Sequence, residues 1–82
     1  MNASIWIIVR YYNNLNISEF MGCFSTRKKA HDYVINYIKR YDLADLSELI
    51  EEKYINYSYI NSSEAEYHIT KVALNEGSHI IL

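Results

Sequence analysis

CFSTRKKAHDYVINYIKRY, residues 23–41, is the stretch that decides the fold, because a strand end is followed there by a turn and an amphipathic helix. Ser25 or Thr26 can cap the helix, since a side-chain oxygen accepts a hydrogen bond from an unpaired N–H group of the first turn. An apolar stripe then repeats at helical spacing, at Ala30, Val34, Tyr37, Ile38 and Tyr41. The pattern predicts a helix that buries this stripe against a sheet.

Strands are predicted before the helix, and a second helix after it. Residues 4–12 are rich in β-branched and aromatic side chains and are apolar on both faces, as in a central strand. The Asn-rich turn 13–16 joins them to a second strand, 17–24, in a hairpin. The second helix is expected from Asp42 or Asp45 to about Lys53, because Asp45 and Glu48 have the capping-box spacing.

The C-terminal third is predicted to complete the sheet. The alternation in YINYSYI, residues 54–60, indicates a half-buried strand with Tyr57 and Tyr59 on one face and Ser58 on the other. Residues 66–74 are expected to form another strand, before the short apolar end HIIL, residues 79–82. We therefore expect one α+β domain over residues 1–82, ordered strand–strand–helix–(helix)–strand–strand–(strand). Its antiparallel or mixed sheet would have four to five strands, with one or two helices on one face.

The segment GCFSTRKKAHDYVINYI, residues 22–38, resembles one that is common in small phage and bacterial domains. In those domains a strand ends in Gly-x-Phe/Tyr-Ser-Ser, a helix opens with Glu-Lys-Ala, and a later strand like YHITKVAL, residues 67–74 here, closes the sheet. This chain departs from the pattern by placing Arg27 and Lys28 where an acid is usual. Such domains are mostly without assigned function, so the resemblance implies a fold and no site residue.

Length and composition limit the class of protein. Eighty-two residues, half of them hydrophobic, make one small folded domain and exclude a disordered acidic chain. Cys23 is the single cysteine, which rules out an internal disulfide and fits a reducing compartment, so we expect an intracellular protein without a membrane span. Nine tyrosines with abundant Ile and Asn are typical of an AT-rich genome, in a low-GC microbe or one of its viruses. The alternative is a Tyr-rich binding surface.

The formal charge of −2 is divided between a basic and an acidic segment. The basic segment 27–40 contains Arg27, Lys28, Lys29, Lys39 and Arg40. The acidic segment 42–66 contains Asp42, Asp45, Glu48, Glu51, Glu52, Glu64 and Glu66. The cations at the helix start could face these acids in the same or a neighbouring chain, an acidic protein partner, or a nucleic-acid backbone. The acidic segment could itself imitate such a backbone and occupy a basic groove.

Metal binding and catalysis are not expected. The candidate metal ligands are Cys23, His31, His68 and His79. No two of them have a spacing typical of a metal site, such as C-x₂-C or H-x₃-H. Cys23 and His68 could meet across neighbouring strands as a nucleophile and its base, but a buried, inert thiol is commoner. With only Gly22 and Gly77, the chain has no Gly-rich phosphate loop. We expect no cofactor, no small-molecule substrate and no enzymatic activity.

The sequence favours a non-enzymatic protein–protein interaction module, either a homodimer or larger assembly, or a small viral protein that binds a host or viral protein in the host cytoplasm. The candidate contact residues are Trp6, Ile7, Tyr11, Tyr57, Tyr59, Arg27, Lys28 and Lys29. One alternative is a nucleic-acid-binding domain that uses the basic helix 27–40, although the acidic total disfavours it. The other is an acidic nucleic-acid mimic that uses residues 42–66.

Overall fold

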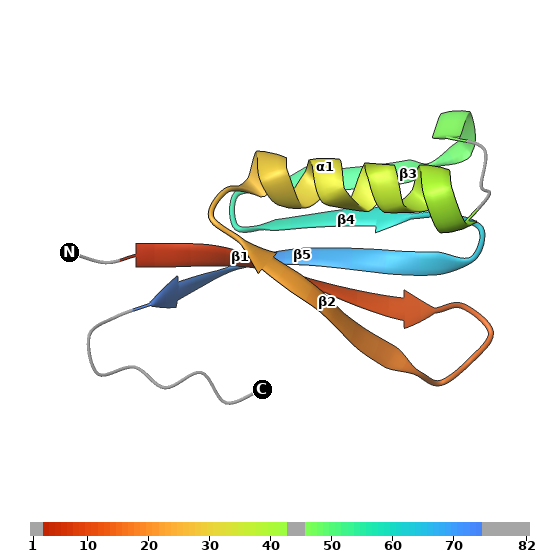
Figure 1. Ribbon diagram of the computed structural model, residues 1–82, viewed down its shortest axis with the longest axis horizontal. Helices are drawn as coiled ribbons and strands as arrows, with labels where there is room; N and C mark the ends of the chain where they lie inside the picture. Colours follow the sequence, from red (N-terminus) through yellow and green to blue (C-terminus); the bar gives the residue numbers. More distant parts are fainter. Residues whose placement is uncertain (1–2, 43–45, 75–82) are drawn as a thin grey trace.

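The computed structural model describes residues 3–42 and 46–74, and within them five strands form one antiparallel sheet. The strands are β1 (Ala3–Tyr12), β2 (Ser18–Phe24), β3 (Ile50–Tyr54), β4 (Tyr57–Asn61) and β5 (Ala65–Leu74), arranged in the order β2-β1-β5-β4-β3. Helix α1 (Arg27–Tyr37) continues into a π-helical turn (Ile38–Asp42), and a 3₁₀ turn (Leu46–Glu48) precedes β3. Figure 1 shows α1 running along one side of the sheet. The α+β class is confirmed, and β1 is an interior strand as predicted.

Helix α1 begins and packs where the sequence pattern indicates. Thr26 is its N-cap, and the Thr26 hydroxyl accepts a hydrogen bond from the Lys29 N–H at 3.1 Å. Ala30, Val34 and Ile38, spaced four residues apart, are completely buried. The stripe fades at Tyr41, whose side chain is 60% exposed, because the α-helix ends at Tyr37 and the following turn is π-helical. The buried stripe is therefore three residues long.

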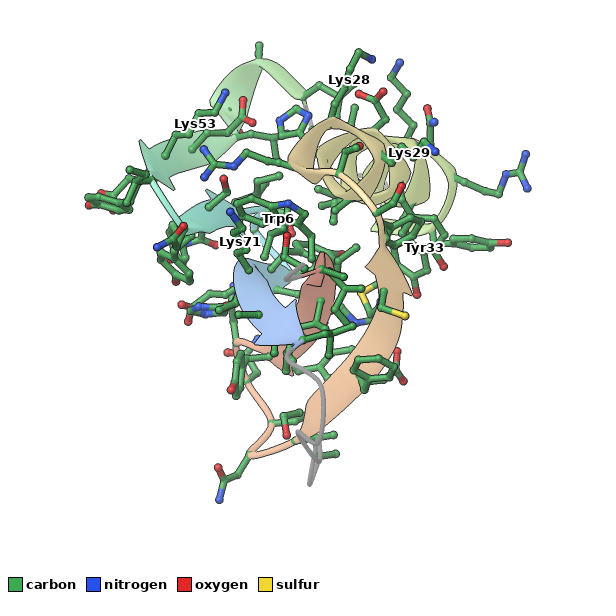
Figure 2. The ribbon with its side chains drawn as sticks, turned by 90° about the vertical axis from the view of Figure 1, so that its left-hand side faces the viewer. Trp6, Lys28, Lys29, Tyr33, Lys53 and Lys71 are labelled. Carbon is green, nitrogen blue, oxygen red and sulfur yellow. The ribbon has the colours of Figure 1, made fainter. Side chains whose placement is uncertain are left out.

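The hydrophobic core lies between α1 and the inner strands of the sheet. Its buried residues are Trp6, Ile8, Ala30, Val34, Ile38, Ile60, Ala65, Tyr67 and Ile69. The helix packs on β1, β2 and β5. In the end-on view of Figure 2 the sheet curves around α1, with Trp6 beneath the helix. The core described here thus lies on one face of the sheet, between that face and the helix.

The predicted second helix is wrong, because residues 50–54 form β3 instead. Ile50–Tyr54 pairs antiparallel with Tyr57–Asn61 across the two-residue turn Ile55-Asn56. This pairing satisfies backbone groups along the whole segment and prevails over the helical spacing of the leucines. The charged run Glu51-Glu52-Lys53 lies on the edge strand, where exposed charges discourage further strand pairing. Asp45, the expected cap, lies outside the described residues.

The predicted strand 54–60 is divided by the same turn, which leaves Tyr54 on β3 and begins β4 at Tyr57, and the predicted alternation holds within β4. Ser58 and Ile60 point toward the core and are buried, whereas Tyr57 and Tyr59 lie on the opposite face. The turn length fixes the register of β4, and register decides the face of every side chain. The predicted strand 66–74 is confirmed as β5, while the expected strand at 79–82 lies outside the described residues.

A bulge in β2 sets which side chains of this edge strand reach each face. The register between β1 and β2 shifts between Ile8 and Val9. Gly22 at this point has a φ of +149°, in the region that favours glycine. After the shift Phe20 pairs with Val9, on the face away from α1, and Glu19 pairs with Arg10 on the helix side.

Candidate interaction surfaces

The face of the sheet away from α1 is the first candidate surface, and we call it the open face. The strand registers place the following residues on it: Ile5, Ile7, Val9, Tyr11, Phe20, Cys23, Ile50, Glu52, Tyr54, Tyr57, Tyr59, Asn61, Glu66, His68, Thr70 and Val72. Among the described residues no helix packs on this face, since α1 lies on the other side (Figure 1). Tyr11, Phe20 and Tyr54 are each about half exposed there, at 44%, 50% and 54%.

Aromatic side chains gather at the middle of the open face, around His68. The ring centre of His68 lies 4.9 Å from that of Tyr11 and 5.2 Å from that of Tyr59, both edge-on. Tyr57 forms a hydrogen bond with His68 Nδ1, and its ring stacks on Tyr54 with 6.0 Å between centres. Rings of this kind offer a large apolar contact with a polar tip, as binding surfaces often do.

The charges on the open face are all negative. By register it carries Glu52 and Glu66 but no lysine or arginine among the described strand residues. The Glu66 carboxylate lies 3.6 Å from His68 Nε2. Burial, and then the Glu66 carboxylate, raises the pKa of Tyr59, and burial raises that of Tyr57. The hydrogen bond to Glu52 raises the pKa of Tyr54. The face therefore favours neutral tyrosines and repels phosphate groups.

The raised tyrosine pKa values predict a loss of stability at alkaline pH. A pKa above its unfolded value of about 10 contributes stability that is complete below that pH and is lost as pH rises through the folded value. We expect urea denaturation curves to be unchanged between about pH 8 and 9.5 and to shift to lower urea above pH 10. Tyr59→Phe should show a smaller shift than wild type. Ultraviolet titration in which every tyrosine ionises at one ordinary pKa would contradict the prediction.

The candidate contact residues divide between the two faces of the sheet. Ile7, Tyr11, Tyr57 and Tyr59 lie together on the open face. Trp6 does not join them, because its side chain points toward α1 and is only 8% exposed. Because β1 carries apolar side chains on both faces, the sequence did not show which face the helix covers. The structure therefore corrects the placement of Trp6.

The three cations at the start of α1 have local partners rather than the acids expected for them. The Arg27 guanidinium donates to the carbonyls of Tyr54 and Ile55 in the β3–β4 turn, and it lies 4.4 Å from the centre of the Trp6 ring. Lys28 pairs with Asp32 one turn along the helix, at 2.7 Å, and this hydrogen bond lowers the pKa of Asp32.

Lys29 is held at the start of the helix and has no acidic partner among the described side chains. The Lys29 ammonium donates to the Ser25 hydroxyl at 3.3 Å. Within the described chain none of the three cations pairs with a carboxylate of residues 42–66, and a pairing with those acids of a neighbouring chain stays a prediction. A side-chain contact between the basic and acidic segments joins His31 and Glu51, at 2.6 Å.

The acidic segment does not form one continuous row. Glu51 and Glu52 are neighbours on β3 and point to opposite faces, Glu51 toward His31 on the helix side and Glu52 to the open face. Glu66 lies two strands away on β5. An imitation of a nucleic-acid backbone needs regularly spaced charges on one surface, and this arrangement gives that hypothesis no support.

The described residues contain no metal-binding cluster or nucleophile–base pair of the kinds considered. They hold no group of three or more His, Cys, Asp or Glu side chains placed to bind a metal. Cys23 and His68 do not meet, because they pair with Ile7 and Val9, two positions of the intervening strand β1. Cys23 is exposed rather than buried, and His79 lies outside the described residues. No described helix has the length and apolar character required to cross a bilayer.

Several surface residues were missed from the sequence. Phe20, Tyr54 and His68 belong to the open face. An unbroken strand over residues 54–60 would place Tyr54 on the face of Ser58, and the bulge that orients Phe20 has only Gly22 as a signal. Tyr33 and Tyr41 are exposed on and just after α1. Their spacing of eight residues, two helical turns, was the available signal.

Comparison of the chain with protein-family models, curated proteins and solved structures finds no match. The resemblance to phage and bacterial domains therefore stays a prediction.

Proposed function

We propose that the protein is a non-enzymatic interaction module that associates with a second copy of itself through the open face. The observation that carries this proposal is the aromatic surface around His68, which no described helix covers and on which no described lysine or arginine lies. Exposed apolar patches of this extent usually mark an interface. A face-to-face dimer would form a two-sheet sandwich with the open faces about 10 Å apart.

The dimensions of the open face suit a protein interface. Five strands spaced about 4.8 Å apart, averaging about seven residues at roughly 3.3 Å each, give a projected area of about 550 Å². Because the side chains make this surface uneven, its accessible area is larger than its projected area and approaches the ~800 Å² that each partner contributes to an interface of standard size. A single copy also has a thin core, because one eleven-residue helix covers part of a five-stranded sheet. Covering the open face would therefore stabilise the fold itself.

The charges on this face favour a protein over a nucleic acid. Exposed tyrosine rings alone would suit stacked bases, but a phosphate backbone needs cations beside the rings. Glu52 and Glu66 occupy those positions instead. Tyrosine hydroxyls at the margin of the interface stay hydrated, as is common in polar interface rims.

Sedimentation equilibrium tests the proposal directly. At roughly 100 μM, well above a micromolar Kd, wild type should have about twice the monomer mass of 9.7 kDa. Tyr11→Glu/Tyr54→Glu adds two charges to half-exposed positions of the open face and should return the mass to that of the monomer. Tyr41→Glu is the matched control, because this tyrosine is similarly exposed beside α1 on the other side of the sheet. It should leave the dimer intact.

Three outcomes would overturn self-association through the open face. One is a wild-type monomer at this concentration. Another is a dimer that the open-face variant leaves unchanged. The third is a monomer whose open face is protected from hydrogen exchange in the full chain but loses that protection when residues 75–82 are deleted. This result would identify residues 75–82, rather than a second copy, as the occupant of the open face. A circular dichroism spectrum like that of wild type confirms that the double variant is folded.

A further inference from the structure

A second surface, separate from the open face, lies along the flank of α1 that overhangs β2. We call it the tyrosine flank, and it consists of Lys29, Tyr33, Asn36, Tyr37, Lys39, Arg40 and Tyr41. Tyr33, Tyr37 and Tyr41 are spaced four residues apart, so their rings follow one another along the helix axis. Ring centres are separated by 6.4 Å between Tyr33 and Tyr37 and by 4.8 Å between Tyr37 and Tyr41.

The rings of this flank are fixed at one edge and exposed at the other. Phe24 of β2 lies 5.2 Å from Tyr33, and Tyr67 of β5 lies 6.3 Å from Tyr37, so the sheet supports the row from below. Tyr33 is 40% exposed, and Tyr41 more so. Six of the seven flank residues, all but Lys29, line a hollow of about 610 Å³. Tyr33 and Tyr41 therefore present exposed rings, while Tyr37 between them is half-buried, with the Arg10 guanidinium 4.8 Å from its ring centre.

Cations accompany these rings, in contrast to the open face. Lys39 and Arg40 are exposed, and no carboxylate pairs with either among the side chains that the structure describes. The Lys29 ammonium donates to the neutral Ser25 hydroxyl, and no described carboxylate pairs with it. Two described acids lie near this flank, and both are already paired, Asp32 of α1 with Lys28 at 2.7 Å and Glu19 of β2 with Arg10 at 2.8 Å. Figure 2 shows Lys29 and Tyr33 on one flank of the helix, with Lys53 on the opposite side.

We propose that the tyrosine flank binds single-stranded nucleic acid. Aromatic rings that stack on bases, with cations that follow the backbone, are the two components by which proteins bind single strands without sequence preference. An acidic peptide would use the cations but not the row of rings, and a duplex hides its base faces. The site lies on the other side of the sheet from the proposed dimer interface, so each proposal can fail while the other stands.

Fluorescence anisotropy with a labelled oligothymidylate of ~12 nucleotides provides the test, since this length covers one such binding site. Binding should be measurable at low salt and should weaken with a slope of about −2 in log K against log salt, as for three phosphate contacts on a single strand. A duplex that contains the same strand should bind at least about 5-fold more weakly, because its bases are already stacked.

Three double variants distinguish binding at the tyrosine flank from binding that depends on net charge alone. Lys39→Gln/Arg40→Gln should raise the Kd for the oligonucleotide at least about 10-fold. Lys53→Gln/Lys71→Gln removes the same charge from strands β3 and β5, away from the flank in Figure 2, and should change the Kd less than about 3-fold. Tyr33→Leu/Tyr41→Leu keeps the charge and the apolar volume but removes the π faces, and it should also weaken binding about 10-fold or more.

Each of several results would overturn the proposal. Wild type that fails to bind at low salt excludes the site. Equal losses in the two charge variants would mean that binding depends on overall charge alone. Duplex affinity equal to that of the single strand, or full binding by the tyrosine variant, would make this a general polyanion surface of the kind that an acidic peptide also occupies.

Discussion

Val34→Asp is expected to abolish folding. Val34 is completely buried in the middle of the stripe that α1 packs against the sheet. An aspartate there would place an unpaired charge in the core, at a cost of several kcal/mol even after the carboxyl becomes protonated. A domain of 82 residues is expected to have only about 3–5 kcal/mol of stability in total. Far-ultraviolet circular dichroism should show a largely unfolded chain without a cooperative melting transition.

Two control variants show whether burial is the cause. Asn36→Asp introduces the same charge two residues further along the helix, at an exposed position, and should leave the free energy of unfolding within about 0.5 kcal/mol of wild type. Val34→Ala removes two methyl groups and should lower that free energy by about 2 kcal/mol, since it leaves a cavity without a charge. If Val34→Asp melts cooperatively near the wild-type temperature, the packed face of α1 must be a different one.

The part of the fold that follows local rules could be predicted from the sequence. The first hairpin and α1 depend on an Asn-rich turn, a Thr26 cap and a stripe at helical spacing, all within 40 residues of one another. Each feature acts through groups a few positions apart, so the residue pattern determines it. The same reasoning located the apolar side chains of β1 but not the side of the sheet on which the helix lies. Trp6 was misplaced for this reason.

The edge strand β3 shows where local rules fail. Glu51, Glu52 and Lys53 have better helix than strand propensity, and the preceding Leu and Asp residues have helical spacing. The segment forms a strand because β4 offers it a backbone partner across the short turn Ile55-Asn56, which lacks the usual Asn-Gly signature. Whether a neighbouring strand is available for pairing depends on the tertiary structure, which local sequence rules do not describe. Both the absence of the predicted helix and the division of the predicted strand 54–60 follow from this one pairing.

Arg27 explains the basic start of α1 better than any counter-charge does. Its guanidinium joins the first helical turn to the carbonyls of the β3–β4 turn, and these acceptors are backbone atoms that no charge pattern reveals. A planar guanidinium can also stack on a ring, as Arg27 does on Trp6. The open face and the tyrosine flank were only partly visible in the sequence, since each combines side chains that the topology assembles from distant segments.

Arg10→Ala is expected to have the second largest effect on stability. Arg10 is only 5% exposed, and its guanidinium donates to the hydroxyls of Tyr12 and Tyr37 and to the Glu19 carboxylate. Burial alone would lower its pKa, but the hydrogen bonds with Tyr37 and Tyr67 outweigh it and raise the pKa. One side chain thereby connects β1, β2 and α1. Removing it should lower the free energy of unfolding by about 3 kcal/mol, because packing and several charge-assisted hydrogen bonds disappear together.

A double-mutant cycle identifies which contact carries this energy. Glu19→Gln should cost less than about 1 kcal/mol, because the carboxylate is half exposed and the ion pair is screened by solvent. Tyr37→Phe should cost about 1–2 kcal/mol in wild type, since it leaves the buried guanidinium short of an acceptor while its Nε already has none. In the Arg10→Ala background the same change should cost almost nothing. Additive losses in urea denaturation would show that Arg10 contributes by filling space rather than by joining the helix to the sheet through Tyr37.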